Sequence, residues 1–439
     1  MSYHQPQAAH VLDSVKERIK DAIYALSSCL CRPSATVKIN GRTFKIIKVL
    51  GEGGFSFVYL AEDEASGRQF ALKKIRCPTG SEDVKEAMRE VEAYRRFRHP
   101  NIIRILDSAV VQDTDGEGKI VYLFLPLYKR GNLQDAINAH MVNNTRFSES
   151  EMLRLFKGTC EAVRAMHTFR AQIGASKPTA SSSRGQEPQP TPAASSQPNG
   201  RGKGPAGPDD DDEDDELLPH PEGDADGGYS YHGSDNGASV PLVTKRAVQE
   251  EGEVVFDGDE ELPGHGVPNG NVDPSKTEVV PYAHRDLKPG NVMIADDGIP
   301  ILMDFGSTIK ARIRIDDRRQ ALLQQDIAAE QSTMAYRAPE LFDVKTGKTL
   351  DEKVDIWSLG CLLFALAYLH SPFETMQTTE QGGSIAMAVM NAQYKHPSNS
   401  SYSQGFKDLI DDMLKADPQQ RPDIHQVLES TDRVLRSLA

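Results

Sequence analysis

Two short runs of the sequence carry residue types suited to phosphoryl transfer. Residues 284–291 read His-Arg-Asp-Leu-Lys-Pro-Gly-Asn, and an Asp-Phe-Gly triplet begins at Asp304. In the first run, Asp286 can orient and deprotonate a hydroxyl nucleophile, and Lys288 can neutralise the migrating phosphate. Asn291 and Asp304 can hold Mg²⁺ against the phosphates of a nucleotide. Because both runs occur in order with short apolar segments around them, they predict a phosphoryl-transfer site rather than a solvated charged loop.

A glycine-rich turn near the start of the chain also suits a nucleotide. Residues 43–50 read as a strand that leads into this turn. Glycine lets the backbone approach phosphates closely, and Val58 can cover the adenine face. Ser56 stands where the usual pattern has its third glycine, so this signal is weaker than the two runs above. The residues expected to contact the nucleotide here are Leu50, Gly51, Glu52, Gly53, Gly54, Phe55, Ser56 and Val58.

A lysine and a glutamate are expected to form the ion pair that supports the phosphates. The run that contains Ala71, an expected nucleotide contact, and ends at Lys73 fits the strand that carries this lysine. Lys74 is the competing candidate, but the Ala-x-Lys spacing selects Lys73. The helix predicted over 82–97 offers Glu86, Glu90 and Glu92. The expected mid-helix position selects Glu90, and at least one of the others is expected to be a solvent-facing helix charge.

The segment that connects the two halves of the predicted site reads as a buried strand followed by a hinge. Residues 120–128 are almost wholly apolar, and a helix is expected to begin just after Gly131. Counting back from that glycine places Leu125 at the back of the nucleotide pocket. Pro126 follows it and has no N–H, but an adenine amino group needs only its carbonyl. The N–H of Tyr128 would then supply the second hydrogen bond to adenine.

The composition indicates a partly disordered chain in a reducing compartment. Hydrophobic residues make up only 38% of the 439 residues, which is low for a compact globule. The five cysteines are odd in number and mostly scattered, so they form neither a disulfide framework nor a paired zinc motif. No apolar run approaches the ~20 residues that a membrane-spanning helix requires, and the N-terminus lacks a signal-peptide core. We therefore expect a cytoplasmic protein.

The net charge of −14 belongs almost entirely to residues 171–280. This segment has 7 Lys+Arg and 22 Asp+Glu, a balance of −15, which leaves +1 for the remainder. It is rich in Ser, Pro and Gly and contains eight consecutive acids at 209–216, so it cannot bury enough apolar surface to offset its ordering entropy. We predict a disordered insert, with the acids as a solvated spacer rather than a metal or basic-partner site. The near-neutral remainder gives no indication of nucleic-acid binding.

The N-terminal residues 1–42 contain a predicted amphipathic helix that ends at two cysteines. Val11, Val15, Ile19, Ile23, Leu26 and Leu30 recur at spacings of three and four. One interpretation is a helix packed on the rest of the protein, with Cys29 and Cys31 as ordinary buried residues. The other, which we favour, is a membrane-surface helix whose Cys29 and Cys31 are S-palmitoylated, because two acyl chains give the double anchor that stable attachment needs.

Over 43–170 and 281–437 the chain resembles eukaryotic protein kinases, and within them it is similar to the Numb-associated kinase family, in particular to a small acylated branch with fungal vacuole-associated relatives. The motifs that carry the resemblance are Leu50-Gly-Glu-Gly-Gly-Phe-Ser56, Ala283-His-Arg-Asp-Leu-Lys-Pro289, Asp304-Phe-Gly-Ser307, Gln331-Ser-Thr-Met-Ala-Tyr-Arg-Ala-Pro-Glu-Leu341 and Val354-Asp-Ile-Trp-Ser-Leu-Gly-Cys361. In that family Ser56 is the normal residue. The myristoylation glycine of the acylated member is absent here, since Ser2 follows Met1.

The resemblance implies an α+β, two-lobed protein-kinase fold with a β-rich N-lobe and a helical C-lobe, interrupted by the insert just before the catalytic loop. It implies ATP and Mg²⁺ as cofactors, protein substrates with Ser or Thr, and a helix late in the activation segment, which residues 322–329 fit by propensity. Thr333 is expected to buttress Asp286 and Lys288, and Arg421 to pair with Glu340. The family also implies a peripheral membrane protein of the vacuole or Golgi.

The expected protein is an active, autophosphorylating serine/threonine kinase. Arg285 is expected to accept a phosphate of the activation segment, on Ser307, Thr308, Ser332 or an autophosphorylated site between them, unless the helix orders that segment without one. A pseudokinase scaffold that binds nucleotide without transfer is the main alternative. A second alternative makes the acidic insert the functional core and the kinase domain its carrier. The sequence indicates no oligomeric state.

Overall fold

The computed structural model describes most of the predicted catalytic domain. The residues it describes are 35–53, 56–78, 80–113, 118–172, 277–375, 378 and 383–438. The predicted N-terminal helix, Cys29 and Cys31, the glycine-turn residues Gly54 and Phe55, and the acidic run all lie outside these ranges. None of the helices within them combines the length and the apolar composition needed to cross a bilayer.

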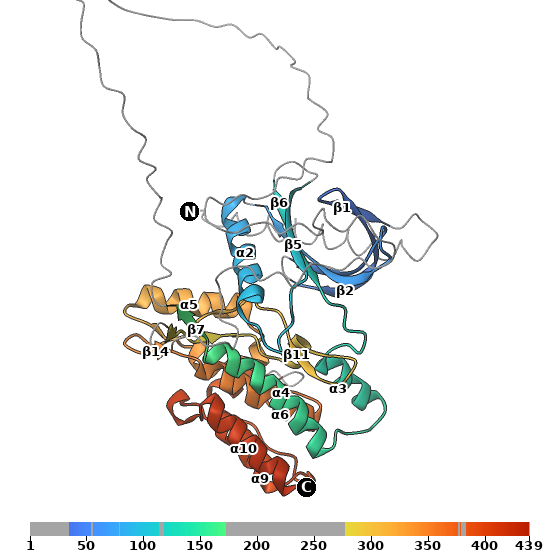
Figure 1. The fold of residues 1–439 in the computed structure, drawn as a ribbon. Helices are drawn as coiled ribbons and strands as arrows, with labels where there is room; N and C mark the ends of the chain where they lie inside the picture. Colours follow the sequence, from blue (N-terminus) through green and yellow to red (C-terminus); the bar gives the residue numbers. More distant parts are fainter. Residues whose placement is uncertain are drawn as a thin grey trace, which may run out of the picture.

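The smaller lobe is a six-stranded antiparallel sheet with helix α2 (Ser81–Arg96) against one side (Figure 1). The strands lie in the order β1-β2-β3-β4-β6-β5, so the last two in the chain exchange places. Their bounds are β1 (Thr36–Ile39), β2 (Arg42–Glu52), β3 (Ser56–Asp63), β4 (Gln69–Cys77), β5 (Asp107–Gln112) and β6 (Lys119–Leu125). The strand predicted over 43–50 and the helix predicted over 82–97 are both present, with shifted ends.

The two faces of this sheet have different neighbours because side chains alternate along a strand. Phe44, Phe70 and Phe124 form a cluster on one face, with ring centroids 5.2–5.5 Å apart. Leu72 on β4 joins that cluster, and the next residue, Lys73, therefore projects from the other face toward α2. Because side chains alternate along β4, Lys73 points toward the junction between the lobes, whereas Leu72 packs in the aromatic cluster.

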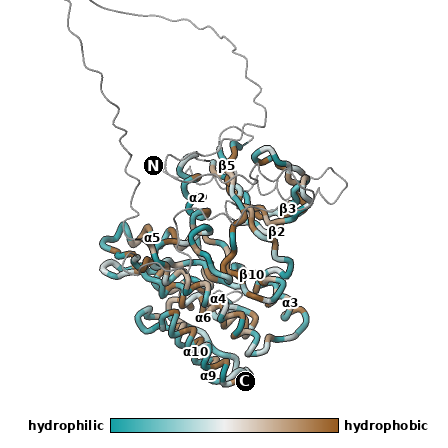
Figure 2. The backbone as a smooth tube through the Cα atoms, viewed as in Figure 1, coloured by the Kyte–Doolittle hydropathy of each residue, from teal (hydrophilic) through white to brown (hydrophobic). Residues whose placement is uncertain are grey.

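The larger lobe is helical and is built around α6 (Lys353–Tyr368), whose residues Val354–Tyr368 are all buried. Figure 2 shows hydrophobic residues concentrated in the interior and hydrophilic residues along the outer helices α3 and α10. The other helices are α3 (Leu133–Val142), α4 (Glu149–His167), α5 (Arg318–Gln331), α8 (Ile385–Met390), α9 (Gln404–Met413) and α10 (Ile424–Ser437). This arrangement, together with the β-rich smaller lobe, confirms the predicted α+β, two-lobed fold.

Side chains fix where several of these helices begin. Asn132 and Asp135 form a reciprocal capping box at the start of α3, and Asp423 and Gln426 do the same at α10. Ser148 caps α4 by accepting the N–H of Glu151. Short strand pairs and turns complete the lobe: β9 (Tyr282–Ala283) with β12 (Ile309–Lys310), β10 (Val292–Ile294) with β11 (Pro300–Leu302), β13 (Ile313–Arg314) with β14 (Thr349–Leu350), and the 3₁₀ turns η2 (Pro289–Asn291), η3 (Met334–Tyr336), η4 (Pro339–Leu341) and η5 (Pro418–Gln420).

Residues at both edges of the segment predicted to be disordered, 171–280, form strands. The chain leaves α4 through β7 (Arg170–Gln172) and returns through β8 (Thr277–Val279), and the two strands pair antiparallel. The N–H of Val280 also donates to the carbonyl of Phe169 at 2.8 Å. Both edges of the predicted segment therefore have regular structure, because the pairing of β7 with β8 satisfies their backbone N–H and C=O groups. The chain consequently re-enters the fold beside the end of α4, as the position of the catalytic loop requires.

A buried ion pair ties the end of the activation segment to the late helices. Arg421 donates from Nη1 to Oε1 and from Nη2 to Oε2 of Glu340, both at 2.8 Å, and its side chain is fully buried. The remaining N–H groups reach the backbone carbonyls of Lys415, Lys353 and Ala416. This bidentate geometry satisfies every donor of the guanidinium, so the predicted pair is present.

We predict that Arg421→Ala lowers the free energy of unfolding by about 3–5 kcal/mol, because it leaves the Glu340 carboxylate without its partner in a largely buried place. Urea denaturation of the full chain measures this. The matched control is Arg433→Ala, whose exposed pair with Glu429 spans 3.9 Å and should change stability by about 0.5 kcal/mol or less. Equal effects of the two substitutions would contradict the assignment.

Candidate active site

A buried carboxylate of α6 sets the shape of the loop at 284–291. Asp355 accepts the N–H of His284 at 2.8 Å and the N–H of Arg285 at 2.9 Å, and its Oδ2 lies 3.0 Å from Nε2 of His167. Arg285 has a φ of 68°, a left-handed conformation that is unfavourable for a residue with a Cβ. The two hydrogen bonds to Asp355 hold this turn, which directs the following residue, Asp286, away from the core.

Asp286 is the centre of a cluster of four polar side chains. Its Oδ1 accepts the N–H of Thr333 at 2.9 Å and the hydroxyl of Thr333 at 2.8 Å. Its Oδ2 accepts from Lys288 Nζ at 2.8 Å and from Asn291 Nδ2 at 3.0 Å. Lys288 Nζ also donates to the Thr333 hydroxyl at 2.8 Å. Both carboxylate oxygens are thereby fixed in direction, which a group that must accept a proton from a bound hydroxyl requires.

A second cluster brings three charges together from β4, α2 and the loop after β11. Lys73 Nζ lies 2.6 Å from Oε1 of Glu90 and 2.9 Å from Oδ1 of Asp304. Burial disfavours the charged form of Lys73, but the carboxylates of Asp304 and Glu90 outweigh it and raise the pKa of this lysine well above its ordinary value. The Lys73 ammonium in turn lowers the pKa of Asp304. Burial raises the pKa of Glu90, and Lys73 only partly offsets that effect.

The three candidate glutamates of α2 have three different environments. Glu90 is buried against Lys73. Glu86 accepts a hydrogen bond from Nε2 of Gln331, at the end of α5, at 3.1 Å. Glu92 lies 3.8 Å from Arg96 and is mostly exposed. The glutamate selected from the sequence, Glu90, is therefore the buried one. Glu92 is a solvent-facing charge, as expected for at least one of the others.

The predicted adenine-facing residues share one face of the smaller lobe's sheet. Val58 pairs with Lys73 across β3 and β4, and Ala71 pairs with Leu125 across β4 and β6. Residues opposite each other in antiparallel strands, and residues two apart in one strand, lie on the same face. Val58, Ala71 and Leu125 therefore line the surface from which Lys73 projects. Leu50 lies at a register irregularity of β2, and Pro126 and Tyr128 follow the end of β6.

The glycine-rich turn is tight where the structure describes it. Gly51 pairs with Val58 and Glu52 with Phe57, and the N–H of Gly53 donates to the carbonyl of Ser56 at 2.7 Å. A Cβ at Gly53 would lie 3.0 Å from the Ser56 hydroxyl, which is closer than side chains normally approach. A side chain at this position would therefore require the Ser56 hydroxyl to move.

The donors beside this surface fit a magnesium nucleotide. Asn291 uses its amide nitrogen on Asp286, donating to the backbone carbonyl at 2.8 Å as well as to the side chain, so its amide oxygen remains as a ligand. Asp304 has a lowered pKa and keeps 36% of its side chain exposed, so it offers an ionised oxygen to a ligand. Oxygen donors of this kind, few in number, suit Mg²⁺, which keeps several waters and binds phosphate oxygens.

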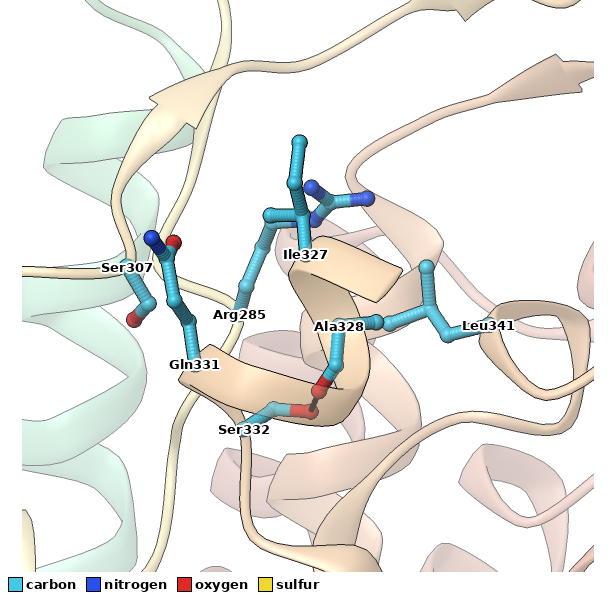
Figure 3. A pocket seen from close by; sticks show the side chains of 7 residues that line it. All are labelled: Arg285, Ser307, Ile327, Ala328, Gln331, Ser332 and Leu341. Carbon is cyan, nitrogen blue, oxygen red and sulfur yellow. Dashed lines mark hydrogen bonds between the residues drawn. The ribbon is translucent and has the colours of Figure 1, made fainter. Parts of the chain in front are cut away.

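Arg285 lines one pocket with Ser307 and Ser332, two of the residues on which a phosphate was expected, but its side chain hydrogen-bonds neither of them (Figure 3). Its buried guanidinium donates to Oε1 of Gln324 on α5 at 3.1 Å, and burial lowers its pKa to about 10. Ser307 donates to the carbonyl of His284 at 2.6 Å, and Ser332 donates to the carbonyl of Ala328 at 2.6 Å (Figure 3). Helix α5 thus covers Arg285, and the predicted helix over 322–329 is part of it. Order in this segment comes from the helix and these hydrogen bonds.

Sequence reasoning missed two residues that organise the site. Asp355 belongs to the motif at 354–361 but was given no role from the sequence, although an acid inside an apolar run indicates a buried, paired carboxylate. Tyr94 lies four residues after Glu90 on α2, and its hydroxyl accepts the N–H of Asp304 at 3.2 Å. The spacing of four places Tyr94 on the same helix face as Glu90, and this spacing could have identified Tyr94 as a site residue from the sequence.

Comparison with known proteins also identifies a protein kinase domain. The protein kinase domain matches residues 44–172 and 280–431. Serine/threonine-protein kinase ENV7 of Saccharomyces cerevisiae is 31% identical over 412 residues, which cover 91% of this chain and 94% of the relative. Human serine/threonine-protein kinase 16 is 29% identical over 404 residues, covering 92% and 94%. Serine/threonine-protein kinase ppk13 of Schizosaccharomyces pombe is 29% identical over 397 residues, covering 90% and 92%.

The neighbouring lysines of β4 allow a matched test of the charge cluster. Lys73→Met removes the cation shared by Glu90 and Asp304, so we expect phosphate transfer to fall by about 100-fold or more, the usual cost of losing one electrostatic contact to a reacting group. Lys74 pairs with Phe57 and Tyr122 and points from the opposite face, so Lys74→Met should retain most activity. The measurement is incorporation of radiolabelled phosphate into a generic protein substrate. A larger loss with Lys74→Met would show that the wrong lysine was assigned.

Proposed function

The chain belongs to the protein kinase family and is a serine/threonine kinase, and on that premise we propose that it transfers the γ-phosphate of Mg-ATP to Ser and Thr hydroxyls of proteins, itself included. The observation that carries the proposal is the cluster around Asp286, in which both carboxylate oxygens are held by Thr333, Lys288 and Asn291. The serine/threonine kinases to which the chain is about 30% identical support it.

In this mechanism each charged residue has one task. Lys73, held by Glu90, binds the α- and β-phosphates, and the sheet face of Val58, Ala71 and Leu125 covers the adenine. Asp286 orients the substrate hydroxyl and accepts its proton as the new bond to phosphorus forms.

Lys288 moves its ammonium from the Asp286–Thr333 pair toward the migrating γ-phosphate, and its presence in this loop supports serine/threonine rather than tyrosine as the acceptor. Asn291 and Asp304 hold Mg²⁺, which when bound neutralises charge on the phosphates.

We further propose that the protein belongs to the Numb-associated kinase family and acts on a membrane surface of the vacuole or Golgi, in membrane trafficking. The support is the amphipathic pattern of residues 11–30, with Cys29 and Cys31 at its end. The motifs quoted above carry the subfamily resemblance. Two S-acyl chains next to an amphipathic helix would keep the catalytic domain at the bilayer.

The proposed reaction predicts that Asp286→Ala lowers phosphate transfer by at least about 100-fold, since the substrate hydroxyl loses its proton acceptor. ATP binding should remain within a few-fold of the native protein, because Lys73, Glu90 and Asp304 are untouched. Transfer is measured with radiolabelled ATP, and binding by calorimetry. Asp408→Ala, on the outer helix α9, is the control and should leave both quantities unchanged. Native-like transfer by Asp286→Ala would rule out the proposed mechanism.

The proposed anchor predicts that changing Cys29 and Cys31 together to Ser moves the protein from the membrane pellet to the supernatant. The same change should abolish incorporation of labelled palmitate that hydroxylamine can release. Changing Ser27 and Ser28 together to Ala alters the same segment without removing a thiol, so this control should remain in the pellet. A double cysteine variant that still sediments with membranes would show that acylation is not the anchor.

A further inference from the structure

Tyr94 stands at the point where the three charges of the active site meet. It lies one helical turn after Glu90 on α2 and is almost completely buried. Residues four apart lie on the same helix face, so its side chain points, like that of Glu90, toward the junction between the lobes. There its ring packs edge-on against Phe305, with centroids 5.0 Å apart and planes at 85°. This apolar contact holds the ring and fixes where the hydroxyl lies.

The hydroxyl contacts the main chain of one of the acidic residues. The backbone N–H of Asp304 donates to the Tyr94 oxygen at 3.2 Å. Burial raises the pKa of Tyr94 well above its ordinary value, and the neighbouring Glu90 carboxylate adds to this effect. The Tyr94 hydroxyl thus accepts from the Asp304 backbone in a buried place beside the Glu90 carboxylate.

The backbone of Asp304 needs such support. Its φ is 65°, in the left-handed region that residues with a Cβ rarely adopt. This conformation turns the carboxylate toward Lys73 and toward the nucleotide-binding face. A hydrogen bond to the N–H of the same residue stabilises the unusual conformation directly, whereas the packing of Phe305 constrains only the following side chain.

We propose that the Tyr94 hydroxyl is a positioning group for Asp304, which holds the main chain of that residue in its metal-facing conformation and thereby sets how strongly Mg²⁺ tightens nucleotide binding. This inference rests on the proposed Mg-ATP-dependent function. It concerns the hydroxyl, since the ring contacts of Tyr94 would be retained by phenylalanine. Tyr94 touches neither the substrate nor the transferred phosphate in this assignment.

The test compares Tyr94→Phe with the native full-length chain. The dissociation constant of ATP is measured with and without Mg²⁺, and kcat and KM are measured as functions of Mg²⁺ concentration. With the hydroxyl removed, we expect the gain in ATP affinity due to Mg²⁺ to fall roughly tenfold, the size associated with one buried hydrogen bond. ATP affinity without Mg²⁺ should stay within about twofold of native, because Lys73 still has both carboxylate partners.

Tyr368→Phe is the matched control. Tyr368 is also buried, and its hydroxyl bonds His396 at 2.9 Å in the larger lobe, far along the chain from Asp304. A purely structural role of a buried hydroxyl would lower the melting temperature in both variants and leave the effect of Mg²⁺ alone. A change in the Mg²⁺ effect confined to Tyr94→Phe supports the inference.

An unchanged Mg²⁺ effect in Tyr94→Phe, in a protein that melts as the native one does, would overturn the inference while leaving the proposed function intact. Loss of the Mg²⁺ effect from the native chain itself would instead contradict the proposed function. The isosteric substitution keeps the packing against Phe305, and the melting temperature verifies that the variant is folded. The two failures are therefore separate results.

Discussion

The shared ion contact of Lys73 with Glu90 and Asp304 is the interaction on which the rest of the structure depends. It joins a strand, a helix and a loop that lie 17 and 231 residues apart in the chain. Charges taken out of water are costly unless they satisfy one another. The smaller lobe, α2 and the Asp304 loop therefore have to come together in one arrangement for these three groups to be stable. That arrangement is also the one that presents a lysine and a carboxylate to nucleotide phosphates.

A second buried carboxylate, that of Asp355, holds the catalytic loop in place. The chain reaches this loop only after more than a hundred residues beyond α4, so local sequence cannot hold it in place. The pairing of β7 with β8 closes the excursion beside the end of α4. Asp355 then accepts two backbone N–H groups of the loop, while His167 from α4 contacts the same carboxylate. An insert at this point is compatible with the position of the loop because α4 and α6 hold the loop through Asp355 and because β9, just before it, pairs with β12.

The features that depend on sequence motifs and on local periodicity could be predicted from the sequence. The chemistry of Asp286, Lys288 and Asn291 and the choice of Lys73 over Lys74 could be assigned from residue type and spacing, whereas the role of Thr333 and the pair of Arg421 with Glu340 followed from the family resemblance. The helix near 322–329 followed from propensity and family resemblance. What could not be assigned depends on contacts between distant segments. The role of Asp355 depends on which loop passes the start of α6, and that of Tyr94 on where the Asp304 backbone lies. The contact of Arg285 with Gln324 and the ordered edges of the insert likewise depend on tertiary packing that composition does not encode.

The central claim is that this charge arrangement transfers phosphate to serine and threonine and does not merely bind nucleotide. Phosphoamino acid analysis tests this claim most directly. The purified full-length chain is first incubated with γ-labelled ATP, a generic protein substrate and Mg²⁺. In the control, EDTA replaces Mg²⁺. The account predicts labelled phosphoserine and phosphothreonine that appear only with Mg²⁺. Nucleotide binding without any labelled product, or label recovered as phosphotyrosine, would contradict it.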